Sequence, residues 1–264
     1  MNEGLRRPLT ARFFVACIVI GLLAGLLSGL FGVGGGTIIV PMLVLLLHFD
    51  QRLAVGTSLA AIVPTASVGV ISYAVHGSVA WIPALILAAG AIVGAQIGTW
   101  LLPRISQTAL RWGFVVFMVL VVVSLFLVVP SRDAGIELTP LSIVGLVALG
   151  LFTGTLSGLL GVGGGVVVVP ALIIVFGASD LIAKGTSLLM MIPAAVSGTV
   201  GNIRRSNVDL VAAATIGGAA CTTTALGAWF ATLIDPFVGI VLFSIFLLFI
   251  AGQMALRAIK GRAG

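Results

Sequence analysis

The sequence predicts an all-helical integral membrane protein built from two repeats of inverted topology. Three observations lead to this fold class: the composition, a series of long apolar runs and a long internal repeat. Of the 264 residues, 60% are hydrophobic and 8% are charged, and the mean hydropathy is +1.32. Soluble domains carry about 25% charged residues. So few charges cannot cover a soluble surface, which excludes a cytosolic enzyme, a nucleic-acid-binding protein and a disordered chain.

The apolar runs define the expected helices in chain order. They cover residues 12–30, 37–47, 53–75, 79–102, 110–130, 139–159, 166–176, 184–203, 208–232 and 236–256. Eight of them are long enough to cross a hydrocarbon core of about 30 Å as helices. The runs 37–47 and 166–176 have only 11 residues each, and both follow the sequence GVGGG. We therefore expect eight long helices and two short helices that are broken or re-entrant.

The first apolar run could be read as a secretory signal, because Arg6, Arg7 and Arg12 precede it. It lacks a convincing A-x-A cleavage site, and it has a full counterpart later in the chain. We therefore interpret it as the first membrane segment.

The internal repeat has an offset of 129 residues. GLLAGLLSGLFGVGGGTIIVP at 21–41 corresponds to GLFTGTLSGLLGVGGGVVVVP at 150–170, and 20 of the 39 positions from Gly21 to Leu59 are identical. The same offset places Pro64 on Pro193 and Trp100 on Trp229. Such a long self-similarity indicates a duplication. The chain therefore divides into an N-terminal repeat, 1–130, and a C-terminal repeat, 131–264, which together form one membrane domain.

The basic residues predict the orientation. If the N-terminus is cytoplasmic and each long–short helix pair returns the chain to the side it left, only Arg132 and Lys184 lie outside. Eleven basic residues then lie inside: Arg6, Arg7, Arg12, Arg52, Arg104, Arg111, Arg204, Arg205, Arg257, Lys260 and Arg262. This asymmetry follows the positive-inside rule and puts both termini in the cytoplasm. Five segments per half make the second half inverted, which is a transporter architecture with its site near the midplane.

The duplicated glycine segments are the predicted substrate site. Three consecutive glycines favour a break in a helix, because each costs about 1 kcal/mol relative to alanine. The helix that follows each break begins with unpaired N–H groups at its positive dipole end, where an anion binds well. The candidate residues are Gly34, Gly35, Gly36 and Thr37 in the first copy, and Gly163, Gly164, Gly165 and Val166 in the second. The alternative is close helix packing, which we assign to the ridges Gly21, Gly25, Gly29 and Gly150, Gly154, Gly158.

Hydroxyl groups follow each glycine segment in the sequence GTSL. Thr57 and Ser58 in the first copy, and Thr186 and Ser187 in the second, are expected near the start of the next helix. There they either cap the helix or donate hydroxyls to a ligand. Asn202 is the additional candidate, since it ends the helix that begins with the second GTSL. Hydroxyl groups without a buried cation would suit weak, reversible binding of an oxyanion.

The duplicated pattern G-x-x-S-G-x-x-G-V-G-G-G-x-x-x-x-P, followed by G-T-S, resembles the TauE/SafE family of sulfite and organosulfonate exporters. Its residues here are Gly25, Ser28, Gly29, 32–36, Pro41 and 56–58, then Gly154, Ser157, Gly158, 161–165, Pro170 and 185–187. The resemblance implies a multi-pass anion permease of the inner membrane. It also implies that small sulfur oxyanions and sulfonates, such as sulfite and sulfoacetate, form the substrate class.

Few groups remain to couple transport to another ion. The aspartates at 50, 180, 209 and 235 all fall at segment ends, so no buried carboxylate relay is visible. Lys184 either attracts an anion or extends to the membrane interface. We expect no cofactor and no metal, because neither CxxC nor metal-ligand spacing occurs. An inside-negative potential would itself drive a monoanion outward by about 2.3 kcal/mol per 100 mV, so a uniporter or weakly coupled exporter is the leading hypothesis.

Three other classes compete with a carrier of small anions. An intramembrane serine protease needs a histidine at membrane depth beside the serine, but His48 and His76 fall in loop positions. An anion channel would share the architecture and differ by unsaturable flux. A structural membrane protein has no need for duplicated helix breaks. We therefore expect a non-enzymatic transporter in contact with the lipid bilayer, without a nucleic-acid partner. The oligomeric state is left open.

Overall fold

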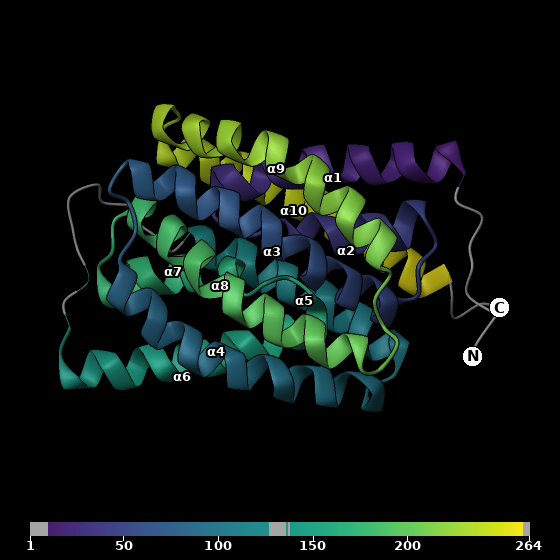
Figure 1. Ribbon diagram of the computed structural model, residues 1–264, viewed down its shortest axis with the longest axis horizontal. Helices are drawn as coiled ribbons and strands as arrows, with labels where there is room; N and C mark the ends of the chain where they lie inside the picture. Colours follow the sequence, from purple (N-terminus) through teal and green to yellow (C-terminus); the bar gives the residue numbers. More distant parts are fainter. Residues whose placement is uncertain (1–9, 127–135, 137, 261–264) are drawn as a thin grey trace.

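The described residues form a bundle of ten α-helices that run roughly along one common direction (Figure 1). The computed structural model describes residues 10–126, 136 and 138–260. The helices are α1 (Ala11–Phe31), α2 (Gly36–Leu46), α3 (Gln51–Val75), α4 (Trp81–Leu101), α5 (Gln107–Phe126), α6 (Pro140–Leu160), α7 (Gly165–Phe176), α8 (Asp180–Ile203), α9 (Leu210–Leu233) and α10 (Pro236–Lys260). A short 3-10 turn, Leu102–Arg104, extends α4. This confirms the all-helical class.

The helix lengths agree with the pattern of long and short apolar runs. Within the described residues, six helices are long and apolar enough to span a membrane: α1, α3, α4, α6, α8 and α9. The short helices α2 and α7 have 11 and 12 residues, and each begins at the last glycine of a GVGGG segment. The remaining long helices, α5 and α10, have 20 and 25 residues. The end of the expected run 110–130 lies outside the described residues.

Small residues hold the outer helix pairs together. Helices α1 and α9 pack closely along their length, and so do α4 and α6. A methyl group added at Gly25 would meet the carbonyl oxygen of Ala220, and one at Gly154 would meet that of Ala91. The other ridge glycines, Gly21, Gly29, Gly150 and Gly158, meet backbone atoms of the same partner helices. The ridges are therefore packing surfaces, as expected, because only glycine lets two helix backbones approach so closely.

The two halves make reciprocal contacts. The pair α1–α9 corresponds to α6–α4 at the repeat offset, and α3 packs against its own counterpart α8 in the centre. Leu59 of α3 faces Gly198, and its counterpart Leu188 of α8 faces Gly69. The duplication therefore extends to the packing of the core. The inverted topology of the halves relative to a bilayer stays a prediction.

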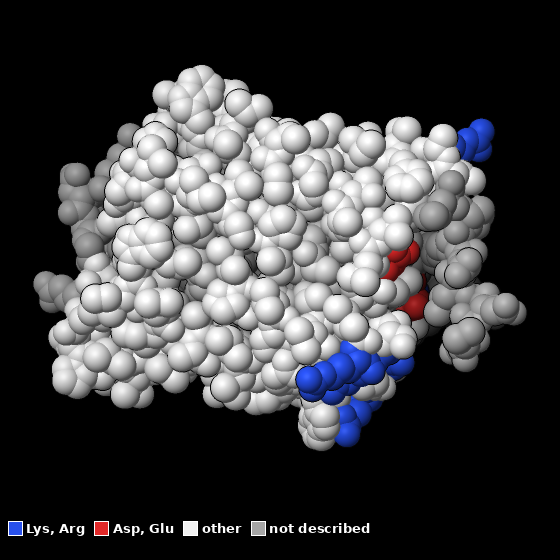
Figure 2. Space-filling model, viewed as in Figure 1, with Lys and Arg blue, Asp and Glu red and all other residues white. Residues whose placement is uncertain are grey.

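Charged side chains gather at one end of the face shown in Figure 2. This is the end where α4 and α8 finish and α3 and α9 begin (Figure 1). Arg104, Arg204 and Arg205 lie at those termini. The rest of this face is uncharged, as a surface in contact with lipid tails would be. The predicted basic residues Arg6, Arg7, Arg132 and Arg262 lie outside the described residues.

Candidate functional site

The glycine segments form two sharp breaks with left-handed backbone conformations. In the first break Gly32, Gly34 and Gly35 have φ of 68°, 72° and 77°. In the second break Gly161, Gly163 and Gly164 have φ of 71°, 85° and 85°. Only glycine adopts these angles without strain. The run of glycines therefore ends one helix and reverses the chain into the short helix that follows.

The two breaks lie directly against each other. A methyl group at Gly36 would meet the carbonyl oxygen of Gly161 and the backbone of Val162. Reciprocally, a methyl group at Gly165 would meet the carbonyl oxygen of Gly32 and the backbone of Val33. Segments 129 residues apart in the sequence thus meet inside the bundle. The structure brings together the two sets of glycines predicted as one site.

The serines of the GTSL segments link each central helix to the opposite break. The Ser58 hydroxyl donates to the carbonyl oxygen of Gly161 at 2.7 Å, and the Ser187 hydroxyl donates to that of Gly32 at 2.6 Å. Both serines are fully buried. These bonds satisfy carbonyl groups that the breaks leave without a helical partner. The hydroxyl groups of both serines therefore donate their hydrogen bonds to the protein backbone.

The expectation that the GTSL residues cap a helix is wrong. Asp50 caps α3 and Ser179 caps α8, so the GTSL segments lie in the second turn of each helix. The threonines instead accept hydrogen bonds from distant loops. Thr57 accepts from the N–H of Asp209, and Thr186 accepts from the N–H of Ala80, both at 3.0 Å.

The start of each short helix has N–H groups that the described part of the protein leaves unpaired. In the described part of the chain, the N–H groups of Gly36, Thr37, Gly165 and Val166 make no hydrogen bond to the protein. Gly35 and Gly164 occupy the N-cap positions and have no side chain with which to cap these groups. The unpaired N–H groups give each helix start a positive character suited to an anion.

Buried hydroxyls without partners accompany these N–H groups. Among the described residues, the Oγ atoms of Ser28 and Ser157 and the Oγ1 of Thr37 have no hydrogen-bond partner. Ser28 and Ser157 are equivalent in the two repeats, and each precedes a glycine break by one helical turn. An unpaired buried hydroxyl costs about 1–3 kcal/mol. Sequence reasoning did not select these serines as site residues, although their identity in both copies was a signal.

Two apolar side chains contact both breaks at Gly34 and Gly163, beside the points where the breaks touch. Added methyl groups at Gly34 and Gly163 would lie 2.6 Å and 2.8 Å from Sδ of Met191. Ile62 also faces both positions, at 3.3 Å and 3.1 Å. Ile62 and Met191 are equivalent in the two repeats and are fully buried. The two side chains fill the space next to Gly34 and Gly163. Sequence reasoning did not identify either of them as part of the site.

Val166 and Asn202, the remaining predicted site residues, place few polar groups at the glycine breaks. Val166 is buried in the first turn of α7, and its side chain offers no polar group. Asn202 packs beside Gly56 and donates from Nδ2 to the carbonyl oxygen of Gly198, whereas its Oδ1 is buried without a partner in the described structure. Asn202 therefore lies near the first GTSL segment rather than at a glycine break.

A buried ion pair lies beside the first break. Lys184 and Asp180 are each 9% exposed, and Nζ lies 2.8 Å from Oδ2. A methyl group at Gly32 would lie 2.6 Å from Cα and 2.7 Å from Cβ of Lys184. Asp180 begins α8, as expected of an aspartate at a segment end, but its burial and its pairing with Lys184 were not foreseen.

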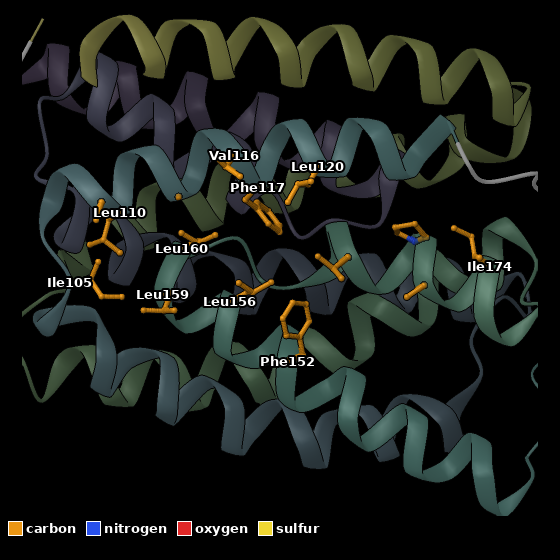
Figure 3. A pocket seen from close by; sticks show the side chains of 15 residues that line it. Ile105, Leu110, Val116, Phe117, Leu120, Phe152, Leu156, Leu159, Leu160 and Ile174 are labelled. Atoms are coloured by element: carbon orange, nitrogen blue, oxygen red, sulfur yellow. The ribbon is translucent and has the colours of Figure 1, made fainter. Parts of the chain in front are cut away.

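An apolar cavity of about 570 Å³ lies between α5, α6 and α7 (Figure 3). Its lining includes Leu110, Phe117, Phe152, Leu156 and Ile174, and no polar side chain lines it. Phe152 and Ile174 are more than half exposed, so the cavity opens on an apolar surface. Moving an ion into such a space costs several kcal/mol. The cavity is therefore unsuited to an oxyanion.

Filling this cavity should leave transport unchanged. Gly113 lines it, has nothing within 4 Å of an added methyl group, and corresponds to Leu242 in the second half. We expect Gly113→Leu to raise the melting temperature in detergent, because it removes a helical glycine that costs about 1 kcal/mol and fills empty space. Thermal unfolding and anion flux check both points. A large loss of flux in a folded Gly113→Leu protein would show that the cavity takes part in transport.

The fold and the paired breaks are those of a multi-pass membrane protein with two buried helix breaks that face each other. Comparison with known proteins gives the family. The model of the sulfite exporter TauE/SafE family matches residues 4–125 and 146–264, and the chain belongs to this family of membrane transporters.

Relatives support the same class. The chain is 31% identical over 231 residues to "probable membrane transporter protein YunE" of Bacillus subtilis, covering 78% of this chain and 84% of that protein. It is 30% identical over 197 residues to YdhB of the same organism, also named a probable membrane transporter protein, covering 74% and 80%. A Haemophilus influenzae protein with that name is 32% identical over 169 residues, covering 61% and 62%. No solved structure matches the chain significantly.

Proposed function

We propose that this protein is a secondary transporter that exports small anions, with sulfite or organosulfonates as the substrate class. The family described as sulfite exporters supports the substrate class. The observation that carries the proposal is the pair of glycine breaks, which face each other and present uncapped N–H groups from Gly36, Thr37, Gly165 and Val166. Helix starts of this kind bind oxyanions through N–H groups and the helix dipole.

The residues of the site suit weak and reversible binding. The N–H groups and the hydroxyls of Ser28, Thr37 and Ser157 can donate to an oxyanion in place of water. The site has no arginine clamp that would retain the anion. The packing of Ile62 and Met191 between the breaks corresponds to an occluded state, in which both sides are closed. Transport then requires the breaks to separate toward one side at a time.

The membrane potential supplies the driving force in this proposal. With both termini in the cytoplasm of a plasma membrane, an inside-negative potential of 100 mV moves a monoanion outward with about 2.3 kcal/mol. This free energy supports an outward gradient of roughly fifty-fold, since each 1.4 kcal/mol is a factor of ten. No proton relay is then required for export.

The experiment is anion flux in proteoliposomes at clamped voltage, with sulfite, sulfoacetate, sulfate and chloride offered separately. We expect saturable flux of sulfite or of the sulfonate, abolished in the double variant Gly35→Leu/Gly164→Leu. Both positions have left-handed φ that leucine does not adopt without strain. Size-exclusion chromatography of the variant establishes that it is folded.

Three other outcomes would each change the proposal. If the folded protein transports none of the sulfur anions, the proposed substrate class is wrong. Unsaturable flux would favour an anion channel of the same architecture. An absolute requirement for a proton gradient at clamped voltage would contradict a uniporter.

A further inference from the structure

The ion pair beside the first break interrupts the equivalence of the two halves. Asp180 and Lys184 correspond to Gln51 and Val55 in the first repeat. Val55 lies against Gly161 as Lys184 lies against Gly32, so the backbone contacts are reciprocal while the charge is not. One break therefore has a buried cation at its edge, and the other has an aliphatic side chain in the same place.

The backbone of Lys184 and the start of its side chain contact the first break of the proposed anion site. The first part of its side chain lies over Gly32, the glycine that ends α1. Ser187, three residues further along α8, donates to the carbonyl oxygen of the same Gly32. The first break, the serine and the lysine thus form one contact region.

The chemistry of the pair allows exchange of the partner anion. The lysine ammonium has three N–H donors, and one of them binds Oδ2 of Asp180. A buried cation without a partner would cost several kcal/mol, so Asp180 keeps the region neutral when it is empty. A small oxyanion that reaches Gly32 and passes along the Lys184 side chain competes with the Asp180 carboxylate for the ammonium group. The substrate can therefore take the place of Asp180 on the lysine, and the displaced carboxylate stays in the first turn of α8, where the positive helix end stabilises its charge.

We propose that Lys184 binds the substrate anion at the Gly32 side of the pathway by exchange with Asp180. This inference rests on the proposed function. Because Gln51 and Val55 offer no charge on the other side, the carrier has unequal affinities for its substrate at its two faces. The face that includes Lys184 binds the anion more tightly, and Asp180 promotes its release.

The test uses three variants in vesicles of both orientations, with sulfite flux measured from each face. Lys184→Gln/Asp180→Asn removes both charges and leaves two amides that can still hydrogen-bond. We expect it to raise KM roughly tenfold at one face only, about 1.4 kcal/mol of lost binding. Asp180→Asn leaves the lysine charge uncompensated, so we expect a lower KM at that face together with a lower maximal rate. Lys184→Arg retains the charge and is the control for folding and side-chain size.

The opposite shifts of KM distinguish substrate binding from a structural role. A structural ion pair would give both variants the same direction of change, or equal changes at both faces, and either result would overturn the inference. If the wild-type protein transports sulfite and the neutral double variant keeps its KM at both faces, only this inference fails. If the wild-type protein moves no small anion, the proposed function fails with it.

Discussion

Replacing Gly36 or Gly165 by alanine should reduce anion flux by roughly 100-fold, a loss of about 2.7 kcal/mol in transition-state free energy. Neither glycine has a positive φ, so alanine creates no backbone strain there. Alanine even favours the helix by about 1 kcal/mol. The effect comes from contact alone: the new methyl group at Gly36 meets the backbone of Gly161 and Val162, and the one at Gly165 meets that of Gly32 and Val33.

The methyl group must push the two breaks apart, because a backbone cannot move aside as a flexible side chain can. This separation disturbs the hydrogen bonds from Ser58 and Ser187 to the carbonyl groups of the breaks. We expect a stability loss of about 1–3 kcal/mol from overpacking, partly offset by the gain in helix propensity. The fall in flux should be larger than the loss of stability alone would cause, because the same contact forms the proposed site.

Gly113→Ala is the matched control. Gly113 is also a helical glycine, but nothing lies within 4 Å of an added methyl group. The measurement compares sulfite flux and thermal unfolding for the three alanine variants. If Gly36→Ala and Gly165→Ala transport sulfite as fast as Gly113→Ala, the contact between the breaks is not required for transport.

Much of the fold was predictable because it depends on local chemistry. Helix positions followed from apolar runs, and the ends of α1 and α6 followed from glycines that cannot continue a helix at low cost. The packing of Gly25 against α9 followed from four-residue spacing of small residues. The starts of α3 and α8 were set two and four residues late, because their caps, Asp50 and Ser179, lie before the apolar runs begin.

The site was predicted only in part, for a physical reason. The repeated glycines indicated which backbone groups are free, but not which side chains from the other half would reach them. The bonds from Ser58 to Gly161 and from Ser187 to Gly32 join residues 103 and 155 positions apart. Repeat equivalence was the available signal for these partners, since Ile62 and Met191 also face both breaks from equivalent positions. Hydropathy alone assigned such residues to an ordinary core.

If the proposed function is correct, Met191→Ala should make the transporter leaky. Sδ of Met191 lies within 3 Å of the methyl positions of both Gly34 and Gly163, and its Cε faces Gly165. Removing the thioether opens the space between the breaks, where Ile62 is then the remaining barrier. We expect anion flux at clamped voltage to rise and to lose saturation, and larger sulfonates to pass more readily relative to sulfite. The double variant Ile62→Ala/Met191→Ala should increase both effects.

Met118→Ala separates this barrier from general loss of packing. Met118 is equally buried, but it lies on α5 in a different part of the core. Each methionine-to-alanine change should cost about 2–5 kcal/mol of stability, so thermal unfolding should shift similarly in both variants. Of the two variants only Met191→Ala should leak, because Met191 contacts both breaks and Met118 lies elsewhere in the core. Equal leak in both variants would attribute the flux to a loosened bundle, and an unchanged, saturable flux in Met191→Ala would show that the barrier lies elsewhere.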